Sequence, residues 1–340
     1  MNHDKLRSTL DRALPTPAQE DAMLAGLLRE DREDQTVKKL SRRAVSLLAA
    51  AVLLAASAFA VAAGLDAKLI RFFGAAPEEA PLLSAAAVPL NVSDTDHGVT
   101  LRISQAIADR YSAMLLIEIT APEGTSLDAE VFTMDTSLNA VAADGERLGG
   151  WSLAWDLLED EVPAGNRASL LLSLHSYDEG ACLLGAALDF TFDGLYEGYG
   201  GSSFDAPQAL SGQWRCRFTL PEEDPGRYVR LDAPIELDGG RVTLRSVYLS
   251  PITYGFQLAE GPDRLLGLDW MHGGDFWKDD VLNTTDGETV ALANFYALGT
   301  AYRTETQLED LGQYLFRPGR IIDPAEIEAV TVCGQRFALE

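Results

Sequence analysis

The chain has 340 residues and a formal net charge of −25 at pH 7, and 47% of its residues are hydrophobic. Residues 1–43 hold nine Lys and Arg against eight Asp and Glu, so nearly all of the negative charge lies beyond residue 43. An acidic surface repels the phosphates of nucleic acids, so we expect no nucleic-acid partner.

The first 43 residues are predicted to form a short helical tail. Leucines recur every four residues before Pro15, and Thr16, Pro17 and Gln19 are typical of the cap and first turn of a second helix. A segment this short buries too little surface to fold alone, so its apolar edges either stay partly disordered or bind a partner. The candidate partner-binding residues are Leu6, Leu10, Met23, Leu24, Leu27 and Leu28.

A transmembrane helix is predicted over residues 44–65. These 22 residues carry no charge, and at about 1.5 Å per residue they match a hydrocarbon core of about 30 Å. Lys38, Lys39, Arg42 and Arg43 directly precede the segment, which favours a cytoplasmic N-terminus. Residues 44–65 are thus expected to contact the lipid bilayer, with residues 1–43 in the cytoplasm and residues 66–340 outside.

Two alternatives to this anchor remain. A cleaved signal peptide is suggested by Ala58-Phe59-Ala60, which resembles a cleavage site, but its charged leader of 43 residues is unusually long. A buried helix of a soluble protein is the other, although the segment has no polar stripe.

Residues 66–90 are rich in alanine and proline, and we expect a stalk with an amphipathic stretch at 69–73 that lies on the lipid surface. Strand patterns follow in two groups. The first group covers 99–104, 112–120, 168–176, 188–192 and 213–220, and the second covers 228–237, 241–250, 254–258, 289–300 and a hairpin over 330–339. The fold class is therefore mainly β, with two β-sandwich domains in series at 91–225 and 226–340.

The sequence contains no recognisable catalytic, cofactor-binding or metal-binding motif. The four histidines, His3, His97, His175 and His272, stand outside any metal-ligand spacing, and no nucleophile or phosphate-loop signature is present. We therefore expect no catalytic residues, cofactor or metal, and no enzyme activity. The acidic loops 93–96 and 275–280 leave calcium as a minor alternative, although neither follows the EF-hand pattern.

Three cysteines, Cys182, Cys216 and Cys333, are too few and scattered for a disulfide framework. Cys216 alternates with Arg215 and Arg217, so we expect it to face a core as a small apolar residue. A bridge between Cys182 and Cys216 is left open.

The run NVSDTDHGVTLRISQAIADRYSAMLLIEITAPEGTSL at 91–127 resembles the start of the outer region in a family of Gram-positive bacterial membrane proteins of unknown function, often described as anti-sigma-factor-like. The order of parts is similar too: KKLSRR, an anchor, then LIRFFG. GGRVTLRSVYLSPITYGFQL and IDPAEIEAVTVCGQRFAL resemble its repeating strand phrases. The resemblance implies a bacterial cell membrane location and Ig-like extracytoplasmic domains.

Together these observations favour a single-pass signalling protein, anti-sigma-factor-like, whose tail binds a sigma factor and whose outer domains sense envelope state or a ligand. The alternative is a non-signalling extracytoplasmic binding or structural protein, for adhesion or the envelope, with a simple membrane anchor. A surface hydrolase is a weaker third hypothesis, because a fold can bring carboxylates together without any sequence motif.

Overall fold

The structure is a computed structural model that describes residues 65–77, 79–158, 165–176, 182–198, 201–237, 240–259, 281–291, 311–318 and 320–339. The chain divides into two compact units, Met1–Ala51 and Val52–Glu340, and all described residues belong to the second. The predicted tail and, apart from Leu65, the predicted transmembrane helix lie outside the described residues. Of the helices within those residues, none has the length and apolar character needed to cross a membrane.

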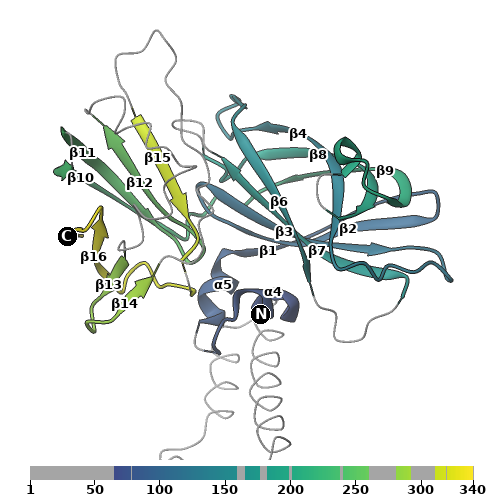
Figure 1. The fold of residues 1–340 in the computed structure, drawn as a ribbon, viewed down its shortest axis with the longest axis horizontal. Helices are drawn as coiled ribbons and strands as arrows, with labels where there is room; N and C mark the ends of the chain where they lie inside the picture. Colours follow the sequence, from purple (N-terminus) through teal and green to yellow (C-terminus); the bar gives the residue numbers. More distant parts are fainter. Residues whose placement is uncertain are drawn as a thin grey trace, which may run out of the picture. The chain divides into compact units, whose positions relative to one another are not determined.

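The described part of the chain is mainly β and forms four antiparallel sheets (Figure 1). Two of them, ordered β1-β2-β3-β7-β6 and β5-β4-β8-β9, make up the first sandwich. Their strands are β1 (Ala87–Asp96), β2 (Val99–Ala108), β3 (Ser112–Thr120), β4 (Phe132–Val141), β5 (Arg147–Leu148), β6 (Trp151–Leu158), β7 (Arg167–Ser176), β8 (Ala187–Glu197) and β9 (Gln208–Thr219), with a 3-10 turn η1 (Gly201–Phe204).

The other two sheets, ordered β10-β11-β12-β15 and β14-β13-β16-β17, make up the second sandwich. Their strands are β10 (Arg227–Leu237), β11 (Gly240–Leu249), β12 (Tyr254–Ala259), β13 (Val281–Thr284), β14 (Thr289–Ala291), β15 (Leu311–Phe316), β16 (Ile327–Val332) and β17 (Gln335–Ala338).

Each sandwich has its own apolar core. In the first, Phe190 and Phe192 stack in parallel with ring centroids 5.4 Å apart, and Trp214 is buried beside them. In the second, Tyr254 and Phe316 stack at 5.8 Å. The mainly β prediction is therefore confirmed, while the finer Ig-like assignment stays a prediction.

Strands with a strong apolar pattern lie where the sequence predicts them. The run 112–120 becomes β3 with the predicted bounds, and β9 buries Cys216 in the core as expected. Strand β1 falls partly in the predicted stalk. Its Pro89 interrupts the strand pattern, and this is tolerated because β1 is an edge strand whose register shifts between Pro89 and Val92.

Strands β3 and β7 are unusual because both of their faces are buried along most of their length. One face, with Leu115 and Leu172, packs into the core of the first sandwich. The opposite face, with Met114, Leu116 and Leu171, belongs to a separate apolar cluster. We call the side of this sheet that carries Leu116 and Leu171 the outer face, and it needs a cover of its own.

That cover comes from the segment 66–90, which contrary to expectation is packed on the protein and is no extended stalk. It contains two short helices, α4 (Ala67–Phe73) and α5 (Ala80–Ala86), which we call the collar (Figure 1). Leu69 and Leu83 are fully buried against the outer face, so the stretch 69–73 contacts protein with the side that was expected to face lipid. Ile252 and Ile321 of the second sandwich join the same cluster.

Leu69→Ala tests the collar's contribution to stability. Because Leu69 is completely buried, its truncation should lower the free energy of unfolding by about 2–4 kcal/mol. Leu157→Ala is the control, since Leu157 is exposed on β6 and should change stability by less than about 0.5 kcal/mol. Urea unfolding of the full-length chain in mild detergent measures both, and equal effects would contradict the packing.

Candidate functional site

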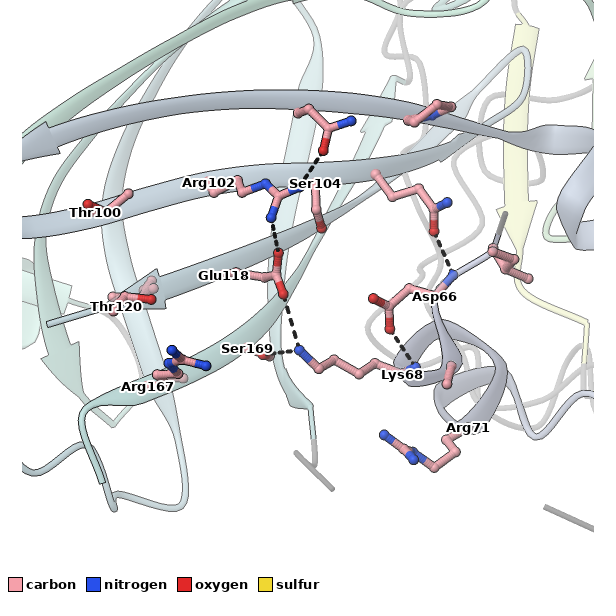
Figure 2. Close-up of a pocket in the computed structure, with 17 residues that line it drawn as sticks. Asp66, Lys68, Arg71, Thr100, Arg102, Ser104, Glu118, Thr120, Arg167 and Ser169 are labelled. Atoms are coloured by element: carbon pink, nitrogen blue, oxygen red, sulfur yellow. Dashed lines mark hydrogen bonds and ion pairs between the residues drawn. The ribbon is translucent and has the colours of Figure 1, made fainter. Parts of the chain in front are cut away.

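The outer face carries an open cleft of about 890 Å³ beside α4 (Figure 2). Strands β2, β3 and β7 form its floor and α4 forms one wall. Polar and charged side chains line it: Asp66, Lys68, Arg71, Asn91, Thr100, Arg102, Ser104, Gln105, Glu118, Thr120, Arg167 and Ser169. These residues come from five separate segments, which sheet pairing brings together.

Lys68 ties α4 to the floor of the cleft. Its Nζ lies 3.3 Å from Oε1 of Glu118 and donates to Oγ of Ser169 at 2.9 Å (Figure 2). Glu118 and Ser169 are direct partners across β3 and β7, so a single lysine spans both strands. The side chain of Lys68 is 18% exposed, so solvent screens this ion pair only partly.

The first turn of α4 is fixed by Asp66. Its carboxylate accepts a hydrogen bond from the backbone N–H of Lys68 at 2.8 Å and so caps the helix. The backbone N–H of Asp66 in turn donates to Oε1 of Gln105 on β2 at 2.9 Å. The start of α4 is thus anchored to β2, β3 and β7.

Cations outnumber carboxylates in the cleft. Arg102 lies 3.6 Å from Glu118, which it shares with Lys68, and Arg167 is exposed at the start of β7. Arg167 makes no ion pair with any residue in the described part of the chain. With Arg71 on α4, the described lining of the cleft holds four cations and two carboxylates in a protein of net charge −25. The cleft is therefore locally basic.

A second polar cluster joins the sandwiches further along the same sheet. Asp109, in the β2–β3 turn, is fully buried and accepts hydrogen bonds at 2.8 Å from the N–H groups of Tyr111 and Ser112. Ser250, in the β11–β12 turn, accepts from Ile252 and Thr253 in the same pattern. The two turns meet where Ser250 Oγ donates to Asp109 Oδ2 at 2.5 Å. We call this group, with Ser112, Thr253 and His175, the junction network.

Burial raises the pKa of Asp109 above its ordinary value, and the hydrogen bonds from Ser250, Thr253 and the turn amides oppose that rise. The network continues from Thr253, which donates to Oγ of Ser112 at 2.9 Å. Ser112 lies 3.0 Å from Nδ1 of His175. Burial, and to a smaller extent the charge of Arg317, lowers the pKa of His175 to about 3. His175 is therefore neutral at physiological pH.

An aromatic contact reinforces this junction. The rings of Tyr111 and Tyr248 meet edge to face at 5.0 Å, and the Tyr248 hydroxyl donates to Asp224 at 2.7 Å while accepting from the N–H of Arg110. Burial raises the pKa of Tyr111 to about 12, so it too stays neutral.

Serine, histidine and aspartate thus occur in one network, yet their geometry is not that of a nucleophilic triad. Ser112, His175 and Asp109 are all buried, and Asp109 bonds to the turn amides and Ser250. The described contacts instead fit a structural link between two turns. The sequence assigns His175 no metal-binding or catalytic role, and it gives no signal for Asp109, Ser250 or Thr253, because none belongs to a motif.

Some of the remaining candidate residues from the sequence lie outside the described part of the chain, and the others lie away from the cleft. The tail residues Leu6, Leu10, Met23, Leu24, Leu27 and Leu28, like His272 and the loop 275–280, lie outside the described residues. His97 and Gly98 form a turn, both with positive φ, and His97 is exposed. No disulfide joins Cys182, Cys216 or Cys333, and burial raises the pKa of Cys216 to about 11.

The acidic loop 93–96 links two strands of the first sandwich. Asp94 accepts from the N–H of Arg215 at 2.8 Å, and Asp96 accepts from the N–H of Gln213 at 2.9 Å. These carboxylates thereby join β1 to β9 across the edge of the first sandwich. Within the described residues, no cluster of three His, Cys, Asp or Glu side chains suits a metal ion.

No protein-family model matches the sequence, and no curated protein matches it. Among solved structures, the chain is similar to one described as the crystal structure of the conserved domain protein from Bacillus anthracis. The two are 12% identical over 69% of this chain and 75% of that chain, with a TM-score of 0.46. This similarity carries no functional assignment.

His175→Gln tests the buried neutral histidine. Because its pKa is about 3 in the folded state and about 6.5 in the unfolded state, stability is complete above pH 6.5 and is lost as pH falls below it. Between pH 6.5 and 5.0 this loss is about 2 kcal/mol at most. The pKa values of Asp109 and Asp156 are raised in the folded state, so these two groups make the protein more stable as the pH falls. Both groups are present in wild type and in the variant, so their effect cancels in the comparison.

Urea unfolding at pH 7.5, 6.5 and 5.0 measures this difference. As the pH falls, the free energy of unfolding should decrease more for wild type than for His175→Gln. This difference is independent of how much the substitution destabilises the protein at pH 7.5. Parallel pH profiles for the two proteins would show that His175 is not held neutral by the fold.

Proposed function

We propose that this chain is a single-pass membrane signalling protein of the anti-sigma-factor-like kind. Its tail, residues 1–43, binds a sigma factor, and its outer β domains respond to a ligand or to the state of the envelope. The predicted helix at 44–65 joins the two sides. The Ig-like class of the outer domains and their extracytoplasmic location are parts of this proposal.

The observation that carries the proposal is the direct attachment of α4 to the β body. Helix α4 begins two residues after the end of the predicted span, and within its first turn Asp66 bonds to Gln105 and Lys68 to Glu118 and Ser169. A flexible stalk would absorb a motion of the outer domains. A packed helix with fixed side-chain links passes such a motion on to the segment before it.

Contacts from both sandwiches to the collar support the same proposal. Ile252, in the β11–β12 turn, and Ile321, after β15, lie in the apolar cluster that holds Leu69 and Leu83. The guanidinium of Arg317 lies 5.1 Å from the ring centroid of Phe72, at a distance typical of a cation–π contact. A rearrangement in either sandwich therefore changes the packing around α4.

Replacing Leu24, Leu27 and Leu28 by Asp tests the tail. Three carboxylates on the predicted apolar edge should abolish binding, because burying an unpaired charge costs several kcal/mol. Tagged full-length protein is isolated from detergent-solubilised membranes, and the captured sigma factor is identified and its target transcripts are measured. We expect loss of the sigma factor and increased transcription.

The matched control places Asp at Thr16, Gln19 and Gln35, which adds the same charge at polar positions of the same tail. This control should keep its partner. If wild type captures no sigma factor, or the leucine variant captures it equally well, the sigma-factor proposal is wrong.

A second experiment tests the topology. In a background of Cys182→Ser, Cys216→Ala and Cys333→Ser, a membrane-impermeant maleimide on intact cells should label Glu222→Cys, which lies at an exposed position between β9 and β10. It should leave Ser8→Cys unlabelled until the membrane is permeabilised. Labelling of Ser8→Cys in intact cells would place the tail outside and refute the proposed orientation.

A further inference from the structure

We propose that the cleft beside α4 binds a phosphate group, carried by a lipid headgroup or by a soluble phosphoester. The proposed ligand deepens the proposed function, and its lipid form rests on the membrane position assigned there. The binding site itself depends only on the described residues.

The local charge is the first argument. Among the described residues that line the cleft, the four cations Lys68, Arg71, Arg102 and Arg167 outnumber the two carboxylates Asp66 and Glu118. The whole chain has a net charge of −25, so this concentration of cations runs against the overall composition. Clefts lined by one sign of charge focus the field and concentrate ions of the opposite sign.

The available donors are the second argument. The guanidinium of Arg102 carries five N–H donors, and within the described residues it meets Asn91 and Glu118. Arg167 has no ion-pair partner there, and its direct cross-strand partner Thr120 adds a hydroxyl to the cleft floor. Planar arginines and hydroxyls suit phosphate oxygens, since guanidinium binds phosphate in a bidentate manner.

The Glu118 carboxylate occupies two of the cations that a phosphate would bind. Its two carboxylate oxygens face different cations, with Oε1 toward Lys68 and Oε2 toward Arg102 (Figure 2). A bound phosphate would compete with this carboxylate for the same donors. Removal of the Glu118 charge should therefore strengthen phosphate binding, whereas removal of a cation should weaken it.

The position of the cleft favours the lipid source. Lys68 and Arg71 follow the end of the predicted span by three and six residues. The headgroup layer on each side of the hydrocarbon core is about 5–7 Å thick. If the predicted span ends at Leu65, then Lys68, three residues further on, lies close to the headgroup layer.

The test uses the full-length chain in neutral detergent and isothermal titration calorimetry. The probes are inorganic phosphate, glycerol 3-phosphate and dihexanoyl phosphatidylglycerol, with glycerol and dihexanoylglycerol as matched probes that lack the phosphate. We expect heat and saturation from the phosphate-bearing probes and none from the other two.

Arg167→Gln should weaken phosphate binding about tenfold, because it removes one charge-assisted contact. Arg147→Gln is its control: it removes an equal charge at an exposed position on β5, in the other sheet of the first sandwich, and should leave affinity within about twofold. Glu118→Gln should tighten binding about threefold, whereas Glu146→Gln, its control on the β4–β5 turn, should not.

The outcomes separate the two phosphate sources. If only phosphatidylglycerol binds, and its binding depends on Arg167, the ligand is a lipid headgroup. If glycerol 3-phosphate binds too, a soluble phosphoester is sufficient for binding. Absence of phosphate-dependent binding, or equal weakening by Arg167→Gln and Arg147→Gln, overturns the proposal. Neither result depends on the tail, so a failed cleft and a failed sigma-factor interaction are distinguishable.

Discussion

The structure depends on one constraint: the central strands β3 and β7 have apolar side chains on both faces. A sandwich buries one face of each sheet, so Met114, Leu116 and Leu171 would meet water on the other. Collar residues and two isoleucines of the second sandwich cover them. Burial of this one apolar sheet face therefore holds the first sandwich, the collar and the second sandwich together.

The same face changes character along its length, and this change places the sites. At one end, the cross-strand partners Arg102, Glu118 and Ser169 are polar and form the cleft floor. In the middle, Leu116 and Leu171 accept the collar. At the far end, the partners Ser112 and His175 are polar again and meet the second sandwich. The outward-facing residues of β3 and β7 are thus polar, apolar and polar in turn, and each of these three parts contacts a different region of the protein.

Much of this could be predicted from sequence, but only at the level of single elements. The run 112–120 predicts β3 because it is continuously apolar, and the same signal shows that both faces are buried. It does not show what covers them, since 66–90 is rich in alanine and proline and has too weak a pattern to predict a packed collar. The cleft was missed for a related reason. Its cations come from α4, β2 and β7, and only strand register makes Arg102, Glu118 and Ser169 neighbours.

Under the proposed function, the stiffness of this arrangement limits how a signal can travel through it. From Ser112 to Thr120, β3 spans about 26 Å, and its backbone is paired on both sides, with β2 and β7. A ligand in the cleft cannot easily bend such a strand, because close-packed interiors resist deformation. It can act on Lys68, whose link to Glu118 lies in the cleft itself and whose helix α4 is the first helix of the collar. Under the proposed function, the route with the least resistance is therefore a tilt of α4 on a sheet that keeps its strand pairing.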